Sequence, residues 1–104
     1  MNHEEIDMAG KKSGSFDKDG IEGLAKDKPV VYDIQNKAGK TLYTGSAKKG
    51  RVEQRLKDHL PGGPDAIPGG TKVKIKQKSS IADAQKSEAR SIKSKMPPQN
   101  IKGK

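Results

Sequence analysis

Two short segments of the chain repeat their hydrophobic residues with a period of two: in VVYDI (30–34), Val30, Tyr32 and Ile34 fall on one face with Val31 and Asp33 on the other, and in KVKIK (72–76) hydrophobic residues alternate with lysines. Alternation with a period of two is typical of a β-strand whose faces differ in burial. After the first segment, the turn NKAGK provides Gly39 for a positive φ, and TLYT returns as the second strand of a hairpin. The second segment directs its lysines outward, so it predicts a third strand with a charged face.

Two other segments repeat their hydrophobic residues at helical spacing. In RVEQRLKDHL (51–60) one valine and two leucines lie four residues apart, which predicts the buried stripe of a short helix. The following run, PGGPDAIPGG, is too rich in proline and glycine for a helix or a central strand and predicts a loop. A second helix should begin after Ser80, an N-cap residue, and end before Pro97.

One residue breaks the hydrophobic stripe of the second predicted helix. Ile81, Ala84, Ile92 and Met96 share one face, and Glu88 occupies the middle of that face. Burying an unpaired carboxylate costs free energy, so Glu88 needs a cation, a hydrogen-bond donor or solvent beside it. A boundary glutamate paired with a lysine is one explanation, and a metal-binding carboxylate is the other.

Residues 1–27 contain isolated hydrophobic residues without a sustained period. We therefore expect a flexible acidic leader here, with a short helical turn near residues 21–25 at most. Residues 28–104 should form the ordered domain. Its expected fold class is α+β, a small three-stranded antiparallel sheet flanked by helices.

Composition and charge narrow the classes of partner. The chain has 104 residues with 29% hydrophobic and 34% charged residues, which allows one domain with a small core. The net charge is +9, and because residues 1–27 hold seven acidic residues against four lysines, the remainder carries +12. Such a body favours polyanionic partners, although a generic soluble basic surface is the alternative. The absence of cysteine excludes disulfides and thiolate metal sites.

Several residues are of types that suit metal-assisted phosphodiester cleavage. Tyr32 and Tyr43 lie on the predicted hairpin, Arg55 and His59 lie four residues apart on the first helix, and Glu88 lies on the second. One carboxylate can anchor Mg²⁺ or Mn²⁺ when waters and a phosphate supply the other ligands. A guanidinium can bind phosphate oxygens as charge develops, and a tyrosine can position a water, or deprotonate it if nearby cations lower the tyrosine pKa.

The sequence resembles the GIY-YIG endonuclease family in four blocks. VVY (30–32) stands at the place of the first motif and YTG (43–45) at the place of the second. YTGSAKKGRVEQRLKDHL continues like the family, with a glycine turn leading into a helix whose arginine is followed four residues later by histidine. EARSIKSKMPPQN is similar to the final block, and the resemblance covers about residues 29–101. Val30 departs from the motif glycine and Thr44 from an aliphatic residue, and the link from the glycine turn to the arginine is slightly extended.

The resemblance implies a role for each matching residue. Tyr32 and Tyr43 would line the site and act on the attacking water, Arg55 would contact the scissile phosphate, and His59 would handle protons. Glu88 would be the single carboxylate ligand of the divalent metal. The alternatives are core tyrosines with satisfied hydroxyls and a histidine that complements the helix dipole.

Three further residues are implied as substrate contacts. They are Lys48 on the turn, Arg51 at the start of the first helix, and Asn100, which in the family often supports the site. Asn100 has the alternative of simply forming a turn after the prolines.

The function implied is a divalent-metal-dependent endonuclease, with DNA favoured over RNA as substrate. The glycine-rich loop and small size resemble GIY-YIG domains of bacterial secreted toxins, so an immunity protein is a candidate partner. We expect a monomer without a membrane partner, located in the cytoplasm or exported as part of a toxin, since no signal peptide is seen. The rival functions are a catalytically silent nucleic-acid-binding module and a protein-interaction domain.

Overall fold

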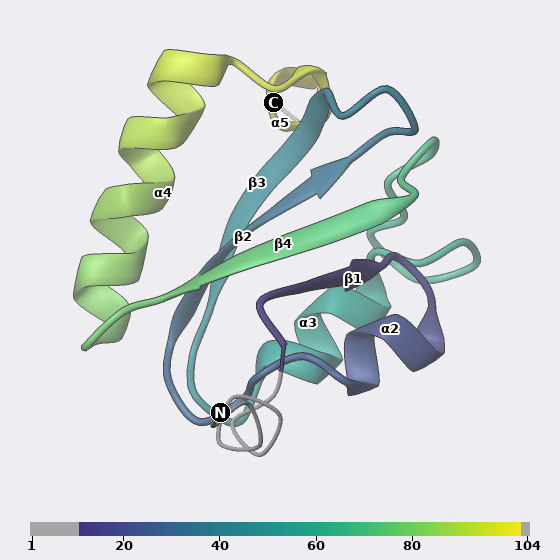
Figure 1. Cartoon of the computed structure of the whole chain (residues 1–104). Coiled ribbons are helices and arrows are strands. Elements are labelled where there is room, and N and C mark those ends of the chain that lie inside the picture. Colours follow the sequence, from purple (N-terminus) through teal and green to yellow (C-terminus); the bar gives the residue numbers. More distant parts are fainter. Residues whose placement is uncertain (1–10, 103–104) are drawn as a thin grey trace, which may run out of the picture.

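A computed structural model describes residues 11–102, which form an α+β fold (Figure 1). Its antiparallel sheet has four strands in the order β1-β4-β2-β3. The strands are β1 (Ser13–Ser15), β2 (Val30–Gln35), β3 (Thr41–Ala47) and β4 (Lys72–Gln77). The helices are α2 (Lys18–Glu22), α3 (Val52–Asp58), α4 (Ile81–Lys95) and α5 (Pro98–Lys102). The predicted fold class is confirmed, but the predicted number of three strands is wrong.

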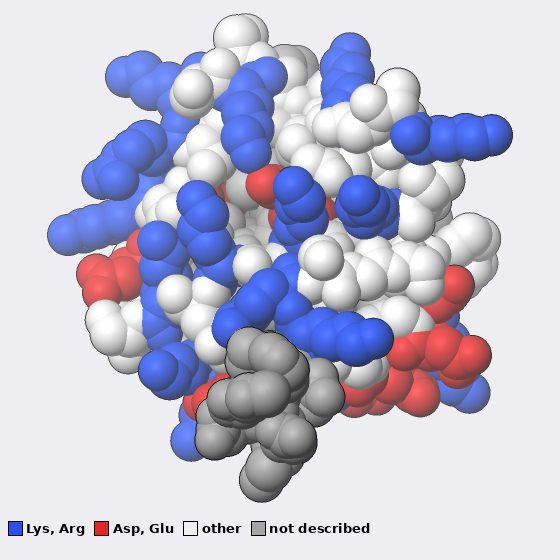
Figure 2. Space-filling model, viewed as in Figure 1, with Lys and Arg blue, Asp and Glu red and all other residues white. Residues whose placement is uncertain are grey.

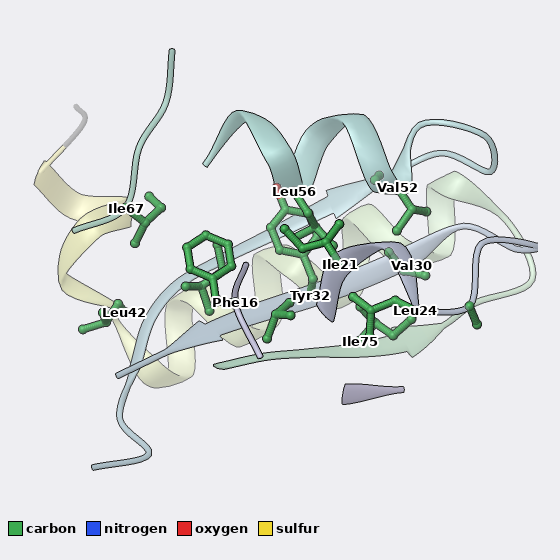
Figure 3. Close-up of a cluster of buried hydrophobic side chains, with 14 residues drawn as sticks. Phe16, Ile21, Leu24, Val30, Tyr32, Leu42, Val52, Leu56, Ile67 and Ile75 are labelled. Carbon is green, nitrogen blue, oxygen red and sulfur yellow. The ribbon is translucent and has the colours of Figure 1, made fainter. Parts of the chain in front are cut away.

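The two faces of the sheet are covered by different helices. Val30, Tyr32 and Ile34 of β2 are buried in the core cluster with hydrophobic residues of α2 and α3 (Figure 3). The intervening residues, Val31 and Asp33, face α4, which packs on β3 and β2. Alternation along β2 therefore directs side chains into two separate layers. β3 is an edge strand, with α3 beyond one face and α4 beyond the other.

The extra strand comes from the segment expected to be a flexible leader. β1 pairs with β4 from Ser13↔Lys74 to Ser15↔Lys72. The isolated hydrophobic residues that follow β1 are all buried in the main core; they are Phe16, Ile21, Leu24 and Ala25. The expectation of a flexible segment is thus wrong for residues 11–25, while residues 1–10 lie outside the described residues. The segment lacks a period because it contributes single side chains from a strand end, one helical turn and a bend.

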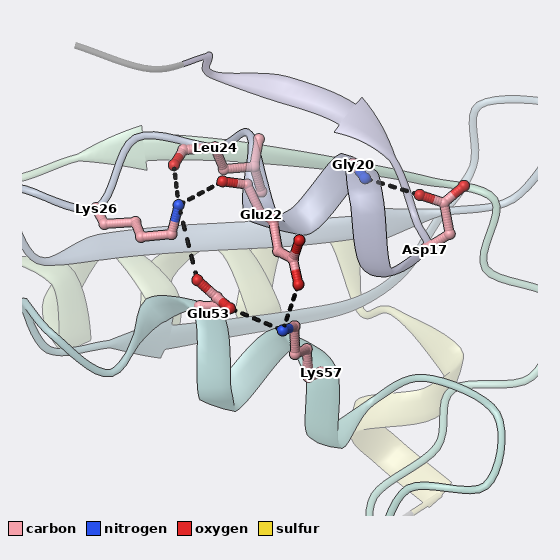
Figure 4. A network of polar contacts seen from close by, with 7 residues as sticks. All are labelled: Asp17, Gly20, Glu22, Leu24, Lys26, Glu53 and Lys57. Atoms are coloured by element: carbon pink, nitrogen blue, oxygen red, sulfur yellow. Dashed lines mark hydrogen bonds and ion pairs between the residues drawn. The ribbon is translucent and has the colours of Figure 1, made fainter. Parts of the chain in front are cut away.

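Polar contacts also hold α2 against α3. Lys57 of α3 donates to Glu22 at 2.8 Å and to Glu53 at 2.7 Å, and Lys26 lies 3.8 Å from Glu53 (Figure 4). Asp17 caps the N-terminus of α2 by accepting from the backbone N–H of Gly20. These ion pairs are largely exposed and contribute little free energy each, so the buried hydrophobic residues hold this segment.

The predicted helices are present. Ser80 accepts from the backbone N–H of Asp83 and begins α4, as its N-cap position predicts. α4 ends at Met96, whose φ of 48° is left-handed, and Pro97 follows. The first predicted helix is shorter than expected, because α3 ends at Asp58 and His59 is its C-cap. None of the described helices is long and apolar enough to cross a membrane.

Candidate active site

The two motif strands are joined by a close approach between Tyr32 and Gly45. The two residues are cross-strand partners on β2 and β3. A Cβ at position 45 would lie 2.5 Å from the Tyr32 hydroxyl oxygen and 2.6 Å from its ring. The Tyr32 ring therefore crosses β3 where the strand has no side chain. Glycine is required at position 45 for this packing.

A hydrogen-bond chain runs from Tyr32 through His59. The Tyr32 hydroxyl lies 2.8 Å from His59 Nε2, and His59 Nδ1 lies 2.8 Å from the backbone carbonyl oxygen of Asp65. A carbonyl can only accept, so Nδ1 carries the proton and Nε2 accepts from the Tyr32 hydroxyl. The loop that follows α3 thus sets the tautomer of a histidine that is only 1% exposed.

Tyr43 completes an aromatic cluster on this face of β3. Its ring centroid lies 4.8 Å from that of His59 and 6.3 Å from that of Tyr32. Tyr43 is half-buried, whereas Tyr32 is buried. The structure therefore brings three of the predicted catalytic residues together, with Tyr43 as the one nearest to solvent.

Burial governs the protonation of this cluster. It raises the pKa of Tyr32 well above its ordinary value, with Tyr43 and the Glu88 carboxylate acting in the same direction and the Arg55 guanidinium opposing. Burial likewise raises the pKa of Tyr43, and it lowers the pKa of His59 below 6.5. At neutral pH both tyrosines are protonated and His59 is neutral. Nearby cations do not lower the pKa of either tyrosine overall, because burial outweighs them.

Cationic side chains line a hollow of about 260 Å³ beside the aromatic cluster. Lys48, Arg51 and Arg55 contribute to its wall, together with Ser46 of β3 and Gln85 of α4. Three cations without a lining carboxylate favour an anionic occupant such as a phosphate. The Arg55 guanidinium lies 3.7 Å from Asp58 and 3.7 Å from Asp65, outside hydrogen-bond distance, so neither carboxylate occupies its donors. The three predicted cations are thus on one hollow.

Glu88 approaches β3 from the α4 face of the sheet, opposite to the face that carries the aromatic cluster. Ser46 pairs with Val31 and points toward α4, where its hydroxyl donates to Glu88 Oε1 at 2.6 Å. Among the described residues Glu88 takes part in no ion pair, so the alternative of a lysine partner is not supported there. The site therefore surrounds the edge strand β3, and Gly45 and Ser46 lie between its two halves.

The residues present fit a hard divalent cation. Within residues 11–102 no three His, Asp or Glu side chains form a cluster that could hold a metal. Mg²⁺ is commonly held by one or two carboxylates and keeps several waters. Glu88 is half-buried and can supply one such carboxylate beside the cationic hollow. A substrate phosphate and waters would complete the ligand set.

Asn100 holds the edge of β3. Its side-chain Oδ1 accepts from the Thr44 backbone N–H at 2.7 Å, and its Nδ2 donates to the Thr44 carbonyl at 2.9 Å. This amide occupies the place of a neighbouring strand and satisfies both edge groups of one residue. The geometry favours a supporting role over direct substrate contact.

Thr44 is buried, and its hydroxyl is satisfied there because it donates to Asp33 at 2.7 Å. This hydrogen bond explains how a polar residue can occupy a motif position that is otherwise aliphatic.

Two residues that the sequence reading did not single out belong to the site. Ser46 orients Glu88, and Asp65 holds His59 through its carbonyl and approaches Arg55 through its carboxylate. Alternation along β3 places Ser46 opposite to Tyr43 and would have indicated it. No local signal identifies Asp65, since its contribution to His59 comes from the backbone of a loop.

The described structure is similar to solved endonuclease domains. It matches the GIY-YIG N-terminal endonuclease domain of UvrC from Thermotoga maritima bound to magnesium, its catalytic divalent cation, with 26% identity and a TM-score of 0.61. The match covers 73% of this chain and 86% of that domain. A form with a tyrosine-to-phenylalanine substitution matches with 25% identity and the same TM-score. No family model matches the sequence, and no curated protein matches it.

The fold and the arrangement of the site define an α+β nuclease-type domain built on a hairpin. The chain is a GIY-YIG superfamily domain.

Proposed function

We propose that this protein is a divalent-metal-dependent endonuclease that hydrolyses phosphodiester bonds in DNA. The observation that carries the proposal is that the Tyr32–His59 pair approaches β3 at Gly45, while the Arg55 hollow and Glu88 both meet the next residue, Ser46. The similarity to the UvrC endonuclease domain, which was solved with its catalytic divalent cation, supports the same reaction class.

Substrate binding is assigned to the cationic hollow. Lys48 and Arg51 are exposed at its wall and can bind phosphate oxygens on the surface. The Arg55 guanidinium presents a planar fork to the non-bridging oxygens of the scissile phosphate, where negative charge increases in the transition state. A divalent ion held by Glu88 would supply further stabilisation of that charge as a Lewis acid.

Proton transfer is assigned to Tyr32 and His59. As a water attacks phosphorus, its proton passes to the Tyr32 oxygen while the Tyr32 proton passes to Nε2 of His59. The elevated pKa of Tyr32 disfavours a free phenolate, so the two transfers are coupled. The new P–O bond forms as the P–O bond to the leaving oxygen breaks, and the leaving oxygen takes a proton from solvent. Asp65 stabilises the resulting imidazolium through its carbonyl.

We propose DNA rather than RNA as the substrate, with an external water as the nucleophile. RNA carries a 2′-hydroxyl that can serve as an internal nucleophile, whereas DNA needs a water and a group to accept its proton. The Tyr32–His59 pair provides such an acceptor.

The test is cleavage by the purified chain. Plasmid DNA and total RNA are incubated with protein and Mg²⁺, Mn²⁺ or EDTA, beside the Glu88→Gln variant. We expect nicked and linear DNA with either metal, and intact DNA with EDTA or with the variant. Binding of DNA without cleavage under all conditions would contradict the proposal and favour a catalytically silent nucleic-acid-binding module.

We infer further that this nuclease serves as a bacterial toxin effector, located in the cytoplasm or exported as part of a toxin, with an immunity protein as its partner. The basis is the small size and the loop between α3 and β4, which is rich in glycine and proline. Induced expression in a bacterial host should halt growth for the wild type and not for Glu88→Gln. Equal growth of the two strains, with both proteins present at the same level, would contradict a toxin role.

A further inference from the structure

A second basic hollow lies on the α4 face of the sheet. Its volume is about 450 Å³, within the range of ligand-binding pockets. Lys12, Lys74, Lys76 and Lys95 line it, and Asp33 is the carboxylate among the lining residues. We call this the lysine groove. In Figure 2, Lys and Arg side chains surround a hollow at the centre of the view, between α4 and β4.

The register of the sheet explains why the lysines gather there. Lys74 pairs with Asp33, and Lys76 pairs with Val31, so these side chains share the face that Val31 and Asp33 present to α4. Both lysines are exposed, because α4 packs on β3 and β2 and leaves the lysines of β4 open. The mutual repulsion of these exposed lysines would be relieved by a bound anion.

The groove has an excess of positive charge. Lys95 donates to Asp33 at 2.9 Å and thereby neutralises the carboxylate, which also accepts from Thr44. Lys12, Lys74 and Lys76 then carry positive charges that no other carboxylate among the lining residues neutralises. The described lining also contains no aromatic ring, so bases have no surface on which to stack. The chemistry matches a phosphodiester backbone read without regard to base identity.

The groove lies on the same face as Glu88 and close to it. Lys76 lies two strands away from Ser46 at the same register, through Val31, which corresponds to about 10 Å at about 4.8 Å between neighbouring strands, and Ser46 contacts Glu88. A nucleic-acid strand advances about 3.4 Å per nucleotide, so the groove is about three nucleotides from the metal-binding carboxylate. A strand bound at Glu88 can therefore continue into it.

We propose that the lysine groove binds the phosphodiester backbone of the substrate about three nucleotides from the scissile bond. This inference rests on the proposed nuclease function and adds a second contact to it. The groove increases the affinity for the substrate and favours long polymers over short ones. The residues around Gly45 carry out the chemical step.

The test compares two double variants of equal charge change. Lys74→Gln with Lys76→Gln removes two groove lysines, and Lys37→Gln with Lys40→Gln removes two exposed lysines from the β2–β3 turn. Binding of a labelled short DNA duplex is measured in EDTA over a range of salt concentrations. We expect the Kd to rise on the order of tenfold for the groove variant, and the salt slope to fall by about 2. The turn variant should stay close to the wild type.

Further variants and measurements distinguish loss of groove contacts from unfolding and from binding of a small anion. The double variant Lys74→Arg with Lys76→Arg keeps both charges and should bind like the wild type, and circular dichroism melting should show that the glutamine variant is folded. With metal present, the groove variant should raise KM and leave kcat unchanged, and substrates shortened stepwise from each end should lose affinity at about three nucleotides. If millimolar inorganic phosphate displaces the DNA and the length of the DNA has no effect on affinity, the groove binds a single small anion and not a polymer, and the proposal is overturned.

The outcomes separate this inference from the nuclease proposal. If the wild type cleaves and the groove and turn variants bind alike, the groove assignment fails alone. If the wild type binds through the groove but never cleaves, the nuclease proposal fails and the groove remains a nucleic-acid-binding site.

Discussion

The hydroxyl of Tyr32 donates to Nε2 of His59 across 2.8 Å, inside the core of the domain. One of these residues comes from the first motif strand and the other from the end of α3. Their pairing places a proton acceptor behind the tyrosine. The tyrosine oxygen can then receive a proton without becoming a free phenolate.

Acid pH should destabilise the protein through His59. Its folded-state pKa is lowered below 6.5 by burial, so above pH 6.5 neither state binds the proton and His59 adds no pH dependence. Below pH 6.5 the unfolded state binds a proton that the folded state does not, and the free energy of unfolding falls with pH. Melting temperatures between pH 6.5 and about 5, where carboxylates are still ionised, should decrease for the wild type. They should decrease less for His59→Gln; equal slopes for the wild type and His59→Gln would remove His59 from this role.

Glu88→Gln should separate the metal ligand from a structural glutamate. The variant keeps the shape and can still accept from Ser46, so the fold should survive with an equal or higher melting temperature. Cleavage should fall by orders of magnitude, because the carboxylate charge is needed for the metal. Glu53→Gln removes the same charge from α3 and serves as the control. A Glu88→Gln protein that is destabilised but fully active would exclude Glu88 from the site.

Arg55→Lys tests the guanidinium fork. Lysine retains the charge in the hollow but cannot bind two phosphate oxygens in one plane, so cleavage should drop with near-normal DNA binding. Arg90→Lys on the exposed side of α4 is the matched control and should behave like the wild type. Cleavage rate and Kd are measured on the same preparations. Equal turnover by the lysine variant would show that Arg55 is only a surface charge.

Gly45→Ala tests the close approach to Tyr32. The added Cβ would meet the hydroxyl at 2.5 Å, so the tyrosine ring must move away from its position over β3. A displacement of about 1 Å can cost about a hundredfold in rate, and overpacking should reduce stability by about 1–3 kcal/mol. Gly23→Ala has its nearest neighbour at 3.8 Å and a φ of −83°, so it should change neither property. Wild-type activity of Gly45→Ala would contradict the packing argument.

The segment before β2 should be essential for folding. Ile21 is fully buried, and Ile21→Ala should lower the free energy of unfolding by about 2–5 kcal/mol in chemical denaturation. Lys18→Ala on the same helix is exposed and should have little effect. Removal of residues 1–26 should abolish cooperative unfolding, in contrast to the expectation from the hydrophobic pattern. A cooperative transition in the truncated protein would show that the core tolerates the loss of all four buried side chains.

Local patterns in the sequence determined much of the fold and the identity of the site residues. Alternation predicted β2 and β4 because a strand exposes each residue to one of two faces, and Ser80 predicted the start of α4 because its side chain can cap the helix. The odd position of Glu88 was visible because a helix repeats every 3.6 residues. These features depend on neighbours within a few residues, so the sequence alone displays them.

Only the tertiary structure decided how distant segments meet. β1 joins the sheet through backbone hydrogen bonds to a strand almost 60 residues later, and its sequence SGS has no pattern that could reveal this. The His59 tautomer depends on the Asp65 carbonyl, and the Glu88 orientation depends on Ser46 across 42 positions. Hydrogen bonds between remote segments form only after the chain has folded, and they follow from the register of the sheet and the path of the loops. The residue types of the site were therefore readable in the sequence, and their geometry around Gly45 was not.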